Sequence, residues 1–157
     1  MSMAATIKSY MLKHHIEYQL VAHPKTYTCR EGAEAVHIAE DHIAKAVIVK
    51  DPQGYAMVVI PGHYWLKLNT INEETGRQFE LAQEAEINQL FSDCQAGAIP
   101  PLGPAYELPT FMDERLLTLA NLYFEAGDHE HLVHLDGEAF RTLLKGVRHG
   151  YFSHNNE

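Results

Sequence analysis

The sequence predicts a single mixed α+β domain whose sheet is largely closed or covered by helices. The chain has 157 residues, 46% of them hydrophobic and 21% charged, which is typical of one globular domain. Helix-like and strand-like patterns are mixed along it, without the strict order of a βαβ protein. Two strand-length apolar runs also flank a turn signal, which predicts a β-hairpin.

The N-terminal part predicts a helix, a strand and a second helix. Apolar residues at helical spacing, such as Ile7 and Met11, predict a helix over 4–15. Alternating residues over 16–21 predict a half-buried strand. The alanine-rich stretch 31–40 contains few residues that disfavour a helix, which predicts a second helix there.

The hairpin is the clearest local prediction. Residues 44–49 read AKAVIV and residues 55–60 read YAMVVI, and both runs have the length of a strand. The DPQG sequence at 51–54 lies between them, with proline and glycine at the second and fourth positions of a β-turn.

The remaining chain predicts short elements around a loop rich in glycine and proline. Helices are expected over 66–78, 84–91 and 137–144. Strands are expected over 79–82, 108–112, 122–125 and 132–135. Asp136 is suited to cap the last helix, and the loop 97–103 (GAIPPLG) cannot be regular helix. The polar tail 151–157 is expected to be frayed.

Composition limits the classes of partner. Twelve Lys and Arg against 21 Asp and Glu give a net charge of −9, which is unsuited to broad nucleic-acid binding through phosphates. A small basic patch that binds one end of an RNA is compatible with this net charge. Two cysteines without CxxC spacing predict a cytoplasmic protein. Neither a secretory signal nor a membrane span is expected, and no feature indicates an oligomeric state.

Lys45 is the first candidate functional residue. Period-two spacing places it on one strand face with Val47 and Val49. If that face is interior, burial of the ammonium costs on the order of several kcal/mol unless a polar or anionic group meets it. Such a lysine suits a ligand's carbonyl oxygen or phosphate. The alternative is a lysine at a strand end, with its head in water.

The loop 97–103 is the second candidate. Gly97 allows a ligand to approach the backbone closely, and Pro100 and Pro101 stiffen the segment. The remaining amides belong to Ala98, Ile99, Leu102 and Gly103. Their fixed directions suit a carbonyl or oxyanion site. The alternative is a tight turn between elements.

Two other chemistries are disfavoured. On a strand His129 and His131 would share a face, but no local carboxylate or thiol completes a tetrahedral metal set and HExxH is absent. A solvated turn is the favoured interpretation there, and no metal is expected. Cys94 with a histidine lacks a local nucleophile signature, so a packed thiol is favoured.

The order of these features resembles the stand-alone YbaK-type proteins, relatives of the editing domain inserted in bacterial prolyl-tRNA synthetases. The matching pieces are His23-Pro24, the AKAVIVKD strand with Lys45, the GAIPPLG loop, DERLL at 113–117 and YFEAG at 123–127. The resemblance covers about residues 4–145 of a single domain expected over 1–157.

This resemblance implies a barrel-like mixed sheet surrounded by helices, and hydrolysis of the ester that joins a wrong amino acid to a tRNA 3′-terminal adenosine. Lys45 matches the family's functional lysine, and Gly97 and Pro101 match its GxxxP loop. The loop backbone would hold the aminoacyl end, and the ribose or a water would supply the reactive oxygen, without cofactor or metal. The expected partners are the aminoacylated tRNA and an aminoacyl-tRNA synthetase that could deliver it. The substrate-binding residues expected are His23, Ala46, Ala98, Ile99, Gly103, Glu125, Gly127 and His129.

The chain departs from the family where specificity is set. The family branch that edits cysteinyl-tRNA usually has serine at the position of Glu125 and an aspartate near Leu132, and the alanine-editing branch usually has asparagine at the position of Ala46. The edited amino acid therefore stays open, although the small Ala46, Ala98 and Ala126 predict a small to medium side chain. The alternative is a catalytically inactive module of this fold that binds an amino acid or an aminoacyl-nucleoside.

Overall fold

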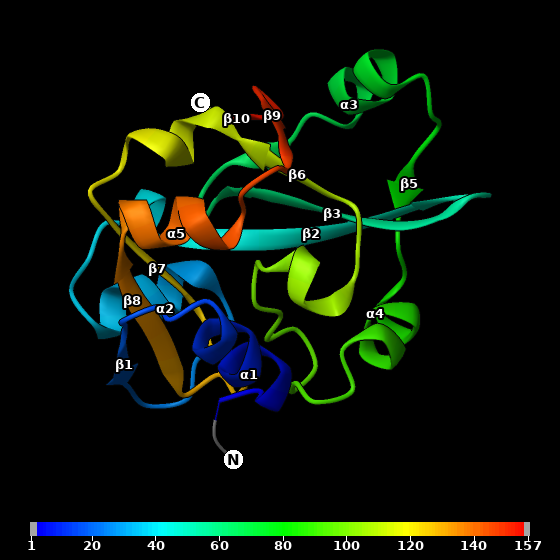
Figure 1. Ribbon diagram of the computed structural model, residues 1–157. Coiled ribbons are helices and arrows are strands. Elements are labelled where there is room, and N and C mark those ends of the chain that lie inside the picture. Colours follow the sequence, from blue (N-terminus) through cyan, green and yellow to red (C-terminus); the bar gives the residue numbers. More distant parts are fainter. Residues whose placement is uncertain (1–2, 156–157) are drawn as a thin grey trace.

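A long hairpin of β2 (Ala44–Asp51) and β3 (Gly54–Pro61) runs through the middle of the molecule (Figure 1). The structure is a computed structural model and describes residues 3–155. The two strands pair along their whole length, from Ala44 opposite Pro61 to Asp51 opposite Gly54. The Asp51 carboxylate closes the turn by accepting from the amides of Gln53 and Gly54. The predicted hairpin is confirmed.

The other expected helices and strands occur in the predicted order, and three short strands, over 65–66, 148–150 and 153–154, were not predicted. The strands are β1 (Gln19–Ala22), β4 (Trp65–Leu66), β5 (Glu80–Leu81), β6 (Thr110–Asp113), β7 (Asn121–Glu125), β8 (His131–Asp136), β9 (Arg148–Gly150) and β10 (Ser153–His154). The α-helices are α1 (Ala5–Lys13), α2 (Cys29–Ala35), α3 (Leu68–Thr75), α4 (Glu84–Leu90) and α5 (Gly137–Leu143). Three 3₁₀ turns are η1 (Glu40–His42), η2 (Gly103–Tyr106) and η3 (Glu114–Thr118). Asp136 caps α5 as predicted, by accepting from the Ala139 amide.

Several elements differ from their expected ranges by a few residues, and two departures, the range of α2 and the burial of β1, have a structural cause. Helix α2 begins early because the Thr28 hydroxyl caps it by accepting from the Glu31 amide, and it ends before His37, which has a φ of 60°. Strand β1 is mostly exposed rather than half-buried, because it forms the edge of its sheet.

The mixed α+β class is confirmed, and the strands of the described chain form three sheets. The largest has the order β5-β2-β3-β6-β9, with parallel pairing of β6 to both β3 and β9. The second is antiparallel, with the order β1-β8-β7, and the third is the pair β10-β4. An isolated bridge between Ile43 and Tyr123 brings the first two sheets together just before β2.

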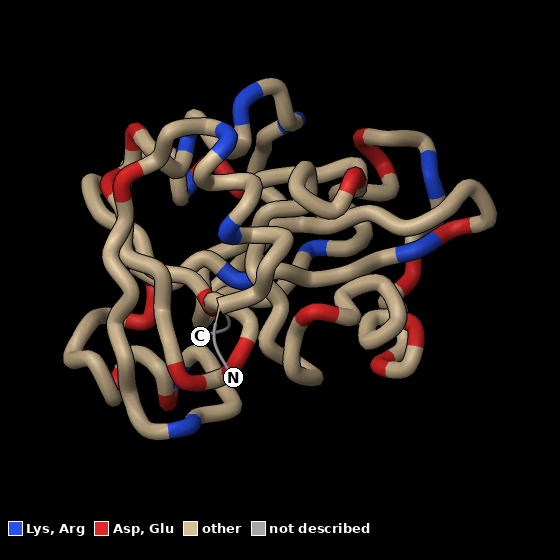
Figure 2. The backbone as a smooth tube through the Cα atoms, turned by 60° about the horizontal axis from the view of Figure 1, so that its bottom comes forward, with Lys and Arg blue, Asp and Glu red and all other residues tan. Residues whose placement is uncertain are grey.

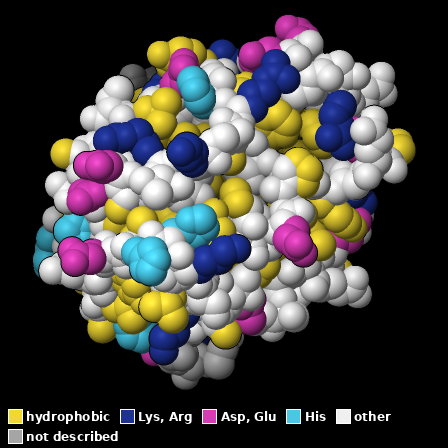
Figure 3. Space-filling model, viewed as in Figure 1, with side chains coloured by type: hydrophobic (Ala, Val, Ile, Leu, Met, Phe, Trp, Pro, Cys, Tyr) yellow, Lys and Arg dark blue, Asp and Glu magenta, His cyan; other side chains and the backbone are white. Residues whose placement is uncertain are grey.

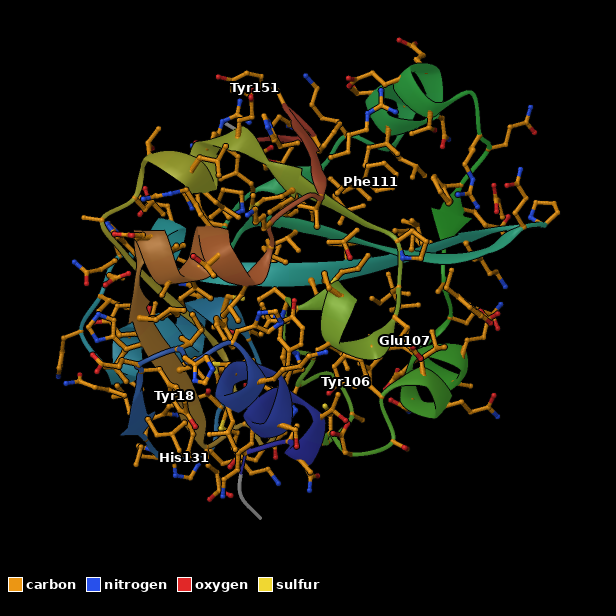
Figure 4. The ribbon with its side chains drawn as sticks, in the orientation of Figure 1. Tyr18, Tyr106, Glu107, Phe111, His131 and Tyr151 are labelled. Carbon is orange, nitrogen blue, oxygen red and sulfur yellow. The ribbon has the colours of Figure 1, made fainter. Side chains whose placement is uncertain are left out.

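Apolar clusters cover both faces of the central hairpin. Ile48 and Met57 belong to a large cluster with α1, α5 and β7, whereas Val49 and Val58 belong to a smaller one. Figure 4 shows Phe111 of the smaller cluster and Tyr106, which packs against the larger one, on opposite sides of the hairpin. Burial on both faces explains why these strands read as nearly continuous apolar runs.

The C-terminal tail is ordered as far as residue 155, so the prediction of fraying is wrong over 151–155; positions 156–157 lie outside the described residues. Phe152 is only 1% exposed. The fully buried Asp113 carboxylate accepts from the Phe152 amide at 2.9 Å and from the Ser153 hydroxyl at 2.7 Å. Arg115 donates to Asp113 at 3.1 Å and to the Ser153 carbonyl at 3.0 Å. A polar clamp from β6 therefore fixes the tail.

Asp113→Ala should lower the free energy of unfolding by about 2–4 kcal/mol, because it leaves buried donors and the Arg115 charge unpaired. Urea denaturation of both proteins measures this difference. Glu114→Ala is the matched control, since its carboxylate pairs with His149 near the surface and should contribute under about 1 kcal/mol. Equal losses for the two variants would contradict the clamp.

Candidate functional site

A cavity of about 480 Å³ lies beside the part of β2 that has no strand on its second edge. Strand β5 pairs with β2 only at Val49 and Lys50. Residues 43–48 therefore form one wall, and helix α4, the segment 26–29 and the loop around Gly97 form the others. The lining is largely apolar, which suits a small organic group with few polar anchors.

Six of the predicted site residues line this cavity: Lys45, Ala46, Gly97, Ile99, Glu125 and His129. The lysine strand and the glycine loop thus meet in space although about fifty residues separate them in sequence. The lining does not include His23, Ala98, Pro101, Gly103 or Gly127.

Two of the residues outside the lining make contacts within the fold. A Cβ on Gly103 would lie 2.0 Å from the Thr110 hydroxyl oxygen, so only glycine fits against β6 there. The Ala98 amide donates within the loop to the Gln95 carbonyl at 3.0 Å. It is therefore not directed at a ligand, and the expectation that this amide forms part of an oxyanion site is wrong.

The open edge of β2 presents backbone groups to the cavity. The Ile48 carbonyl accepts from the Ala82 amide, whereas the Ile43 carbonyl accepts from the Gly62 amide after β3. Backbone groups alternate between the two edges of a strand in an antiparallel ladder. Ala46 lies two residues before Ile48, so its N–H and C=O point to the same edge of β2 as those of Ile48, which is the open edge. The sequence patterns did not reveal these free backbone groups, because they depend on how far β5 extends along β2.

Lys45 is half-buried at the mouth of the cavity. Its ammonium nitrogen lies 5.8 Å from the centroid of the Trp65 ring, within cation–π range. It also lines a second hollow next to the cavity. The side chain is thus neither enclosed in the core nor directed freely into water, and its cation borders both spaces.

The turn after β7 is held by a carboxylate and connected to the glycine loop. Glu125 Oε2 accepts from the amides of Gly127, Asp128 and His129. His129 Nε2 lies 2.7 Å from the Ala96 carbonyl oxygen, which can only accept, so this nitrogen carries the proton. Gly97 follows directly with a φ of 80°, a conformation that favours glycine. Glu125 and His129 therefore fix the loop on which Gly97 lies.

The histidine-rich segment forms a turn that leads into β8, as expected, but Asp128 and His129 are buried in it, so the interpretation as a solvated turn is wrong for these two residues. Asp128 is 1% exposed and accepts from the amides of Glu130 and His131 and from His131 Nδ1, the last at 2.6 Å. Burial acts to raise the pKa of Asp128, but these hydrogen bonds outweigh it and lower the pKa. Within residues 3–155, no three His, Cys, Asp or Glu side chains are arranged to hold a metal ion.

The raised pKa values of the two thiols indicate packed side chains rather than nucleophiles. Burial raises the pKa of Cys94 to about 12. Burial likewise raises the pKa of Cys29, which lines the cavity, to about 11, despite the opposing effect of Lys45. Since the thiolate is the reactive form, both groups are poor nucleophiles near neutral pH.

Helix α4 is anchored to the hairpin by a surface ion pair. Lys50 Nζ donates to Glu86 Oε1 at 2.7 Å, and the Tyr55 hydroxyl donates to the same oxygen at 2.9 Å. These bonds hold the helix so that Ile87 and Asn88 line the cavity. The hydrogen bond from Lys50, followed by those from the Gln83 amide and Tyr55, lowers the pKa of Glu86 to about 2.

The lowered pKa gives Glu86 a pH-dependent contribution to stability. Its pKa is about 2 in the folded chain and near 4.5 ordinarily, so the contribution is present above pH 4.5 and is lost as pH falls toward 2. We expect Glu86→Gln to show a shallower loss of stability over this pH range than the unmodified chain. Urea midpoints measured between pH 2 and 5 test this. Glu84→Gln, on the same helix, should keep the original slope, and a parallel shift of both variants would contradict the assignment.

With the geometry of the site established, comparison with known proteins identifies the family. Residues 23–143 match the aminoacyl-tRNA editing domain, and the chain belongs to this family. A search of curated proteins finds no match.

Solved structures share the fold. The hypothetical protein APE2540 superposes with a TM-score of 0.84 at 24% identity, covering 95% of this chain and 99% of that one. A candidate trans-editing enzyme for prolyl tRNA synthetase gives 0.81 at 22% identity, with 96% of each chain covered. A candidate signal transduction protein from Marinobacter aquaeolei VT8 gives 0.77 at 19% identity, covering 97% of this chain and 31% of its own.

None of the helices between residues 3 and 155 is long and apolar enough to cross a membrane.

Proposed function

We propose that this protein hydrolyses the ester bond of mischarged aminoacyl-tRNA in trans. The observation that carries the proposal is that Lys45 and Gly97 line one cavity beside the open edge of β2. Membership of the aminoacyl-tRNA editing domain family supports the class of substrate. The aminoacyl group enters the apolar cavity, and the terminal ribose lies at its mouth near Lys45.

The chemistry follows from charge. Attack of a water on the ester carbonyl develops negative charge on the carbonyl oxygen, and collapse of this intermediate breaks the bond to the ribose, which leaves as the hydroxyl while the amino acid is released as a carboxylate. Lys45 provides a fixed cation at the cavity mouth, and the Ala46 amide provides a donor on the strand edge beside it. The tether from His129 to the Ala96 carbonyl keeps the Gly97 loop in place as the opposite wall. Proximity and these oriented groups supply the rate enhancement.

Lys45→Ala should lower kcat/KM for deacylation at least ~10²-fold, since one oriented donor is commonly worth about 3 kcal/mol in the transition state. Release of amino acid from a mischarged tRNA measures the rate, and thermal unfolding checks that the variant is folded. Lys8→Ala, an exposed lysine of α1, is the control and should keep full activity. A folded Lys45→Ala protein with unchanged turnover would remove the lysine from the mechanism.

A panel of mischarged tRNAs tests both the activity and the size of the amino acid. Of the three alanines expected near the site, only Ala46 lines the cavity, and it favours small to medium side chains. Differences of a methylene or two should change kcat/KM by roughly 10–200-fold. Cleavage restricted to aromatic amino acids would contradict this preference. Specific binding of an aminoacyl-nucleoside without hydrolysis would identify the inactive binding module instead.

The acidic chain suits contact with a limited part of the tRNA. Figure 2 shows Lys and Arg interspersed with Asp and Glu along the backbone, and on the face in Figure 3 charged, histidine and apolar side chains are likewise mixed. A broad phosphate-binding face would need an excess of cations. Recognition is therefore concentrated at the aminoacylated 3′ end, and an aminoacyl-tRNA synthetase is the partner that could deliver it in the cytoplasm.

A further inference from the structure

A second hollow adjoins the candidate site. It shares Thr28, Cys29 and Lys45 with the lining of the cavity, so the two spaces meet at these residues. Beyond them it is bordered by Arg30, His63 and Trp65. A ligand longer than one aminoacyl-ribose would extend into this hollow past the ammonium of Lys45.

Trp65 presents its ring at the far side of this hollow. The residue is 59% exposed, although it belongs to a strand pair in which it lies opposite His154. Ser153 of this pair is held by the polar clamp, because its carbonyl accepts from Arg115 and its hydroxyl donates to Asp113. The backbone under the indole is thus fixed by buried hydrogen bonds while much of the ring surface stays accessible.

Two cations and one carboxylate line the hollow. Lys45 lies 5.8 Å from the Trp65 ring centroid, and Arg30 lines the same hollow. Glu40 is the carboxylate in the lining, and Glu34 pairs with Arg30 at the surface at 3.3 Å. On a chain of net charge −9, the lining thus has one more cation than carboxylate, next to an exposed aromatic ring.

A second group of aromatic rings around a cation lies next to the ends of this strand pair. The guanidinium of Arg115 lies 5.1 Å from the ring centroids of both Tyr64 and Tyr151. Tyr151 is exposed at the outer rim of the molecule (Figure 4). Arg115 is already paired with Asp113, so here it holds the two rings in place, and exposed rings of this kind are typical of surfaces on which the bases of single-stranded nucleic acid stack.

We propose that Trp65 is a stacking platform for an unpaired base of the RNA 3′ end, with Arg30 against the adjoining phosphate and Lys45 between this base and the ester. This subsite rests on the proposed function, because it takes the nucleotides that precede the aminoacylated terminus in the cavity. The subsite does not discriminate between bases, since every base has a face that can stack on an aromatic ring. It explains how an acidic protein holds an RNA through a few nucleotides.

The chain itself provides the probe, because Trp65 is its only tryptophan. The full-length protein is titrated with a short, uncharged, single-stranded RNA of tRNA acceptor-end sequence, and indole emission is recorded. Stacking predicts saturable quenching. An oligonucleotide of equal length and charge with abasic sites should quench weakly. Equal quenching by the two would mean that phosphates alone are bound, and would overturn the proposal.

Variants test the same contact by fluorescence anisotropy of a labelled RNA. Trp65→Ala should weaken binding about tenfold or more, and Trp65→Phe should recover most of it, since a flat ring is restored. Leu12→Ala, at a site on α1 that is 75% exposed, is the control and should bind normally. Unchanged binding by a folded Trp65→Ala protein would overturn the subsite.

Hydrolysis assays separate this inference from the proposed function. If Trp65→Ala raises KM for mischarged tRNA at nearly constant kcat, both are supported. If deacylation proceeds with an unchanged KM, the deacylase stands and the stacking subsite fails. If uncharged RNA quenches Trp65 but no mischarged tRNA is cleaved, the subsite stands and the deacylase fails.

Discussion

The one-sided pairing of β2 is the constraint on which the site depends. The strand is paired with β3 along its full length, but with β5 only at Val49 and Lys50. The remaining edge cannot be left in contact with apolar groups alone, because its backbone donors and acceptors need partners or water. A space of about 480 Å³ there can accept a ligand that supplies those partners. Lys45 and Ala46 owe their positions to this unpaired edge.

Local sequence was sufficient for the elements whose signals are short-range. The hairpin followed from two apolar runs around DPQG, and the cap of α5 followed from Asp136. The family resemblance placed Lys45 and the Gly97 loop in one site, and both do line one cavity. Composition and periodicity alone could not have joined them, because nothing local to either segment encodes their distance.

Two of the errors have a common physical origin in buried polar contacts, one long-range and one within a single turn. The tail looked frayed because its residues are polar, yet Asp113 satisfies the Phe152 amide and the Ser153 hydroxyl from forty residues upstream. The segment after Gly127 looked solvated, yet Asp128 supplies acceptors for its own turn. Buried polar groups must be paired, and sequence shows the groups but not the partners.

The pairing of β4 with β10 ties one side of the hollow beside the cavity to a segment about ninety residues further along the chain. Trp65 lies on β4, and the strand opposite it consists of Ser153 and His154. The segments that line the cavity itself, from β2, α4 and the Gly97 loop, do not include β10. Substitutions in β10 can therefore displace the indole ring while every residue that lines the cavity keeps its identity.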